Sequence, residues 1–136
     1  MAQNSFEKCI VNILRDIELR KNVDYGDKKS VKQYNAAYCR MKNTAIYINT
    51  NYSDRVDELF ELTSNSDPEI AYAVACLIIY HVECSSTMKR AAIDVVKKLF
   101  KEGKTPKLSE LTLPSCIMNW EKIYSEVAEG TSFEAQ

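Results

Sequence analysis

The sequence is poor in residues that interrupt helices, with three glycines and three prolines among 136 residues. This scarcity favours long helices with few turns over a sheet of many strands, and it leaves little room for a glycine-rich phosphate loop. Histidine occurs once, as His81, and no two cysteines have CxxC spacing. The common catalytic and zinc-binding motifs that use these residues are therefore missing from the sequence.

Long apolar runs and a strong net charge are also missing. The most apolar stretch is shorter than the roughly 20 residues that a membrane-spanning helix needs. A formal net charge of −1 gives no electrostatic case for general binding to DNA or to anionic membranes. The first residues, MAQNSFEK, lack the basic and apolar regions of a secretory signal. We therefore expect neither a membrane protein nor a secreted one.

Cysteine usage and chain length indicate one domain in a reducing compartment. The number of cysteines is odd, their spacing is irregular, and they lie within apolar helical patterns, so we expect reduced, buried thiols and a cytoplasmic protein. The cysteines are Cys9, Cys39, Cys76, Cys84 and Cys116. The length suits a single all-helical domain over residues 1–130, followed by a disordered tail over residues 131–136.

The stretch from Asp67 to Glu83 is the most apolar part of the chain, and a helix start signal stands in front of it. Asp67 suits the N-cap, Pro68 suits the first helical position, and Glu69 suits the positive end of the helix dipole. Apolar residues cover nearly the whole circumference of this predicted helix. We therefore expect a central buried helix that ends near residues 83–85 and is enclosed by the other helices.

The other predicted helices are amphipathic. The first follows a cap at Asn4 or Ser5 and the second a cap at Ser30, and the second ends near residues 49–51. A short third helix follows Ser53. The fifth follows Ser86 or Thr87 and ends at a C-cap glycine, Gly103. The sixth begins at residues 114–115 and ends at Gly130.

Residues 56–104 resemble the two-helix unit of HEAT-like repeats, as found in small bacterial helical domains of unknown function. The resemblance rests on a short helix ending in leucines, the sequence Ser66-Asp67-Pro68-Glu69-Ile70, an alanine-rich inner helix, and a further amphipathic helix. One departure is Ala71, which stands where HEAT units usually place arginine. The resemblance implies an all-α fold, a compact helical bundle or short HEAT-like α-α superhelix of five to six helices.

Cysteine and histidine chemistry has one candidate location, the end of the central helix. Cys76, Tyr80 and Cys84 share one helix face, and His81 is close to Cys84 in sequence. Zinc prefers four such ligands, and a core packing role explains these residues more simply. A thiol near a helix C-terminus also meets the wrong end of the dipole for a stable thiolate. We therefore predict no metal, no cofactor and no catalytic residue.

Two charged segments and several tyrosines are candidate binding residues. The third predicted helix carries an acidic face with tyrosines close before it in sequence, and tyrosine is favoured at interfaces. The predicted partner-binding residues are Asp54, Asp57, Glu58, Glu61, Tyr52 and Tyr47. A solvated helix face and a core-edge position are the simpler explanations of these residues. A basic run over residues 97–107 is a second candidate, for phosphate contacts.

These observations favour a non-enzymatic, bacterial, protein-binding module. HEAT-like surfaces generally recognise other macromolecules, so the resemblance implies a protein partner first. Our most specific hypothesis is an immunity protein that neutralises a cognate toxin by direct binding. The alternative is a HEAT-like nucleic-acid-binding protein that uses Lys97, Lys98, Lys101, Lys104 and Lys107. That basic run contains no arginine, and its one aromatic residue, Phe100, belongs to the apolar stripe of the predicted helix, so it lacks the exposed aromatic and arginine side chains that nucleic-acid surfaces prefer. We therefore expect the protein partner.

Overall fold

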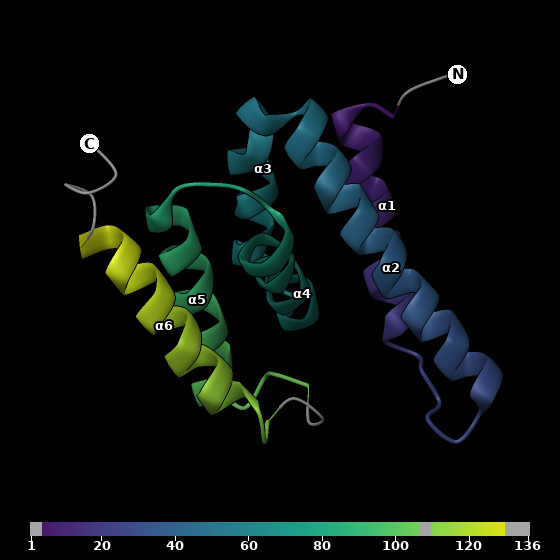
Figure 1. Ribbon diagram of the computed structural model, residues 1–136. Coiled ribbons are helices and arrows are strands. Elements are labelled where there is room, and N and C mark those ends of the chain that lie inside the picture. The colour runs from purple at the N-terminus through teal and green to yellow at the C-terminus, as the bar shows by residue number, and fades with distance from the viewer. Residues whose placement is uncertain (1–3, 107–109, 130–136) are drawn as a thin grey trace.

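The computed structural model describes residues 4–106 and 110–129, and within them the protein is all-helical, with no strand (Figure 1). The predicted fold class is confirmed. The first two helices are α1 (Phe6–Arg20) and α2 (Lys28–Asn51), the longest helix of the described chain. A short α3 (Val56–Phe60) lies between two 3₁₀ turns, η1 (Ser53–Arg55) and η2 (Glu61–Ser64). The chain then forms α4 (Pro68–His81), α5 (Ser86–Lys101) and α6 (Leu113–Glu129).

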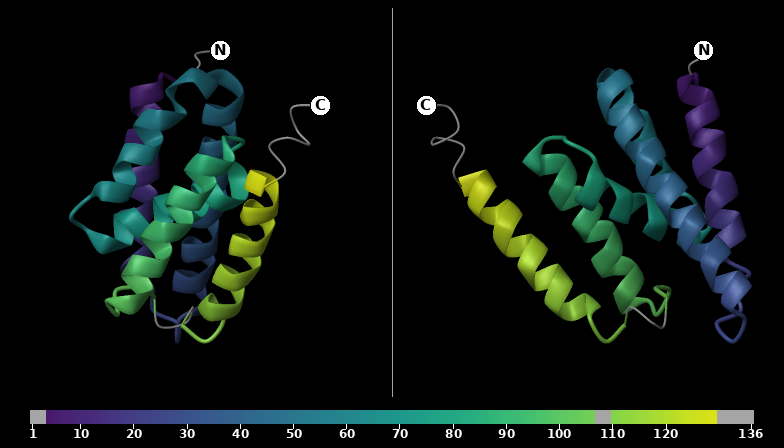
Figure 2. Two further views of the ribbon diagram at one scale, coloured as in Figure 1. Left: turned by 90° about the vertical axis from the view of Figure 1, so that its left-hand side faces the viewer. Right: turned by 45° about the vertical axis from the view of Figure 1, so that its right-hand side comes forward.

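Consecutive helices pack against one another in series. Figure 2 shows α1, α2, α4, α5 and α6 following one another across the molecule. The main packing pairs are α1 with α2, α4 with α5, and α5 with α6, and α2 also contacts α4. None of the helices in the described ranges is long and apolar enough to cross a membrane. Gly130 and the predicted tail over residues 131–136 lie outside the described residues.

Three of the predicted helix starts are confirmed and three are wrong by a few residues. Ser5 caps α1 by accepting the N–H of Lys8 at 3.1 Å, and Asp67 caps α4 by accepting the N–H of Glu69 at 2.9 Å. The sixth predicted start lies within one residue of the observed start of α6. The wrong predictions are those at Ser30, Ser53 and Ser86 or Thr87.

The corrections have local physical reasons. Asp27, not Ser30, caps α2, and Ser30 Oγ instead accepts the N–H of Asp24 at 2.8 Å. Ser85 caps α5 by accepting the N–H of Met88 at 3.1 Å. In both cases a second good capping residue stands earlier in the chain, and the helix begins there. Ser53 caps nothing, because the segment starts as a 3₁₀ turn without a side-chain cap.

The core is built around α4, as predicted, but the enclosure of α4 is incomplete. The fully buried side chains of α4 are those of Ala71, Val74, Ala75, Leu77, Ile78 and Ile79. On one face, however, Tyr80 is 54% exposed, and Tyr72, Ala73 and Cys76 are half-buried. The prediction of full enclosure is therefore wrong on this face, because a cleft opens along it.

The end of α4 is closed by a lysine from the next helix. Lys89, in the first part of α5, is 8% exposed, and its Nζ donates to the carbonyl oxygens of Ile78 (2.6 Å), Ile79 (2.9 Å) and Val82 (2.5 Å). The last carbonyls of a helix have no partner within the helix and carry partial negative charge. The three donors of an ammonium group match these three acceptors. The helix stops at His81, earlier than predicted, because Val82 is already extended.

Gly103 ends α5 as predicted. Its φ of +71° lies in the left-handed region, where a side chain would be strained. The N–H of Gly103 donates to the carbonyl of Phe100 at 3.1 Å, and the N–H of Lys104 donates to that of Leu99 at 2.9 Å. These two bonds are the Schellman pattern of a helix C-terminus.

Polar contacts join α1 to α2, which together form the N-terminal hairpin, and connect this hairpin to α4. Asp16 is 1% exposed, and its Oδ1 accepts from Nε (3.0 Å) of Arg40 and lies 2.9 Å from that residue's Nη2. Lys21, at the end of α1, pairs with Asp67 at the start of α4. The N–H of Glu83 also donates to a side-chain oxygen of α2 at 2.9 Å. These contacts hold α4 beside α2.

Candidate binding surfaces

The predicted acidic surface is present and exposed. The acidic patch consists of Glu7 on α1 and Asp54, Asp57, Glu58 and Glu61 on the segment from η1 to η2, and all five residues are exposed.

One arginine, which the pattern did not reveal, lies within the acidic patch. Nη2 of Arg55 donates to Glu7 at 2.8 Å, and its Nε donates to Glu58 at 2.8 Å. These hydrogen bonds lower the pKa of both carboxyl groups. The other three carboxylates form no ion pair with any residue that the structure describes. The patch therefore keeps unneutralised negative charge.

The two tyrosines predicted beside this surface are half-buried and pack against the core. Tyr52 is half-buried, its ring contacts Phe6 edge-on at 5.8 Å between centroids, and its hydroxyl donates to the carbonyl of Asn4 at 2.7 Å. Tyr47 is also half-buried and lies 6.2 Å from the Tyr52 ring. Both rings pack against the core. The atoms that this end of the molecule offers to a partner are therefore mainly carboxylate oxygens.

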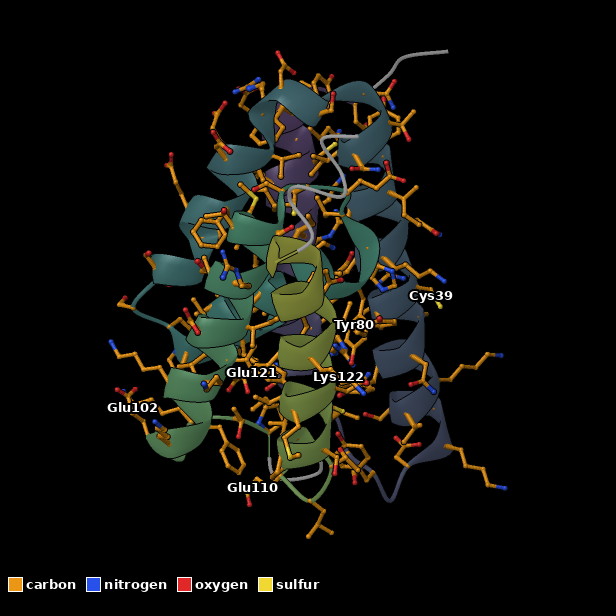
Figure 3. The ribbon with its side chains drawn as sticks, turned by 60° about the vertical axis from the view of Figure 1, so that its left-hand side comes forward. Cys39, Tyr80, Glu102, Glu110, Glu121 and Lys122 are labelled. Atoms are coloured by element: carbon orange, nitrogen blue, oxygen red, sulfur yellow. The ribbon has the colours of Figure 1, made fainter. Side chains whose placement is uncertain are left out.

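Two lysines of the basic run form ion pairs with glutamates. Lys97 pairs with Glu121 of α6 at 2.6 Å, and Lys104 pairs with Glu102 at 3.4 Å. Figure 3 labels both glutamates, one on α6 and one at the end of α5. Lys98 and Lys101 share a shallow hollow of about 370 Å³ with Lys97, Glu102 and Asp94. Lys107 lies outside the described residues.

The cysteine and histidine candidates do not form a reactive group. Burial raises the pKa of the Cys76 thiol to about 12 and also raises the pKa of Cys84. His81 Nε2 lies 2.9 Å from the hydroxyl of Tyr38, and burial lowers the pKa of His81. Within the described ranges, no three His, Cys, Asp or Glu residues are grouped so that they could hold a metal ion. A thiolate with a neighbouring base is therefore not assembled here.

Sequence reasoning missed a cleft between the N-terminal hairpin and α4. The tyrosine cleft, of about 520 Å³, lies along the open face of α4 and is bordered by the end of α1, by α2, and by residues 104–106. Its aromatic lining consists of Tyr25, Tyr34, Tyr38, Tyr72 and Tyr80.

A sequence signal for this cleft did exist. Tyr34 and Tyr38 are one turn apart on α2, and Tyr72, Cys76 and Tyr80 are one turn apart on α4. Each set therefore forms a stripe along one helix face. What the spacing could not show is that the two stripes line the same cleft, because that depends on how α2 packs beside α4.

The chain was compared with protein-family models, with curated proteins and with solved structures. No protein-family model, no curated protein and no solved structure matches this chain.

Proposed function

We propose that this protein is a non-enzymatic binding module whose acidic patch docks on a basic surface of a partner protein. The observation that carries the proposal is the set of three exposed carboxylates, Asp54, Asp57 and Glu61, that no described cation neutralises. Like-signed charge of this kind accelerates association with an oppositely charged surface and disfavours wrong partners. All three carboxylates come from the short segment that runs from η1 through α3 to η2.

The most specific form of the proposal is a bacterial, cytoplasmic immunity protein that neutralises a basic toxin by covering it. A neutraliser needs a rigid, charged surface and no chemistry of its own. The HEAT-like resemblance of the sequence agrees with this role, because surfaces of that kind generally bind macromolecules. The raised pKa values of Cys76 and Cys84 weigh against either residue acting as a cysteine nucleophile. The ion pairs of Lys97 and Lys104 weigh against nucleic-acid binding.

The test is capture of a partner by the purified protein and by two charge variants. The patch variant carries Asp57→Lys and Glu61→Lys. The matched control carries Asp94→Lys and Glu110→Lys, which change the net charge equally at exposed positions elsewhere. We expect a basic protein to be captured from the native lysate, and we expect its association rate to fall about tenfold or more for the patch variant alone.

Two results would remove this proposal. The first is an equal loss of rate in both variants, which would indicate a general effect of net charge. The second is an unchanged rate in the patch variant with its helical content intact by circular dichroism. Co-expression then tests the immunity role, because wild-type protein should restore growth of cells that produce the captured toxin and the patch variant should not.

A further inference from the structure

The tyrosine cleft has the size and lining of a site for a small organic ligand. Its volume of about 520 Å³ lies within the range of roughly 300–1,000 Å³ that is typical of such sites. Ligand sites of this kind combine a mainly apolar or aromatic wall with a few placed polar groups. Five tyrosines supply flat faces and hydroxyl groups, and side chains such as Ala73 and Leu77 add apolar surface.

Arg20 provides the cleft with a positive charge. Its guanidinium carbon lies 3.9 Å from the ring centroid of Tyr34 and 5.1 Å from that of Tyr38. These cation–π contacts place the group over the aromatic wall but do not neutralise it. Its Nε is buried and has no hydrogen-bond partner among the described residues. A buried donor left without an acceptor is costly, so the position calls for an acceptor that the described residues do not supply.

The other two cations of the cleft, unlike Arg20, are already paired with carboxylates. Lys21 is paired with Glu18 and Asp67, and Lys104 is paired with Glu102. Arg20 forms no ion pair with a described residue. Among the residues that line the cleft, three are cations and one is a carboxylate.

We propose that the tyrosine cleft binds a small organic anion with a flat aromatic body. Its acid group pairs with the Arg20 guanidinium, and its body lies against the tyrosine rings of α2 and α4. A guanidinium group suits a carboxylate, sulfonate or phosphate because its planar donors match two oxygens at once. This site is separate from the acidic patch, so it does not depend on the proposed partner surface.

The fluorescence of a tryptophan beside the tyrosine cleft can report whether the cleft is occupied by a ligand. Trp120 is the one tryptophan of the sequence, and its ring lies edge-on to Tyr80, with 5.5 Å between centroids and 79° between planes. Tyr80 lines the cleft and is more than half exposed; Figure 3 shows it beside α6. A ligand that moves or covers Tyr80 should therefore change the fluorescence of Trp120.

The experiment uses two probes that differ by one sulfonate group. 1-Anilinonaphthalene-8-sulfonate carries a sulfonate on an aromatic body, and N-phenyl-1-naphthylamine has the same rings without it. Both are titrated into wild-type protein, Arg20→Gln, and the matched control Arg15→Gln, which removes an exposed arginine of the same helix. We expect one molecule of sulfonate to bind wild type and the control equally, and Arg20→Gln to bind it about tenfold or more weakly.

The uncharged probe and a filled cleft separate this proposal from a purely structural role of Arg20. The uncharged probe should bind wild type and Arg20→Gln alike, and Ala73→Phe, which fills the cleft, should weaken both probes with Arg20 still in place. The proposal is overturned if wild type does not bind the sulfonate, or if Arg20→Gln weakens both probes equally. It is also overturned if Ala73→Phe, shown to be folded by circular dichroism, binds the sulfonate as wild type does.

Discussion

The contact most open to a quantitative test is the lysine that closes the end of α4. Replacing Lys89 by Met keeps a long side chain of similar reach but removes the ammonium group that donates to Ile78, Ile79 and Val82. The variant leaves three carbonyl oxygens at a buried helix end without this partner. Each buried group left in this way costs about 1–3 kcal/mol.

Two effects oppose each other, and their magnitudes decide the result. Burial lowers the pKa of Lys89, which shows that removing the ammonium from water is itself unfavourable. That cost is several kcal/mol for a buried ion, and the variant recovers it. Against it stands the loss of three charge-assisted hydrogen bonds and of a favourable contact with the helix dipole. We expect the loss to win, with a decrease of about 3 kcal/mol in the free energy of unfolding.

The assay is urea denaturation followed by circular dichroism, and the control is Lys98→Met. Lys98 is an exposed lysine of the same helix, so its replacement should change the stability by no more than about 0.5 kcal/mol. For a domain of this size, a loss of 3 kcal/mol corresponds to a decrease of roughly 10 °C in the melting temperature. A Lys89→Met variant as stable as the control would refute the reasoning, because it would mean that desolvation cancels the three hydrogen bonds.

Two further outcomes follow from the pKa shifts. Because burial lowers the pKa of His81 in the folded state, its stabilising effect is present above its unfolded pKa of about 6.5 and is lost as pH falls through the folded value. Wild type should therefore lose stability relative to His81→Gln between about pH 7 and pH 5, and parallel urea midpoints would contradict this. Because the Cys76 pKa is raised to about 12, a disulfide reagent should react first with the exposed Cys39 (Figure 3). A fast phase that persists in Cys39→Ser would contradict this order.

The features that sequence reasoning found are those with local causes. The start of α4 depends on Asp67 and Pro68, which are neighbours in the chain, and the end of α5 depends on Gly103. Such signals can be recognised in a short window. They do not rank two capping residues that lie a few positions apart, however, which is why Asp27, and not the predicted Ser30, caps α2.

The features that were missed depend on segments that meet only in the folded chain. A lysine in an amphipathic helix is expected to be solvated, and nothing near Lys89 in sequence shows that the end of another helix would receive it. The ion pair between the buried Asp16 and the exposed Arg40 likewise joins two helices. The acidic patch could be predicted because exposure follows from helical spacing, but the ion pair between Arg55 and Glu7 could not, since Glu7 comes from α1.

The serial packing of the helices has a consequence for how the chain acquires its shape. Because each helix rests mainly on one that precedes it closely along the chain, few loops must close over long stretches before stabilising contacts form. A nascent chain could therefore assemble progressively as it leaves the ribosome, with the first hairpin formed while the last helix is still being synthesised.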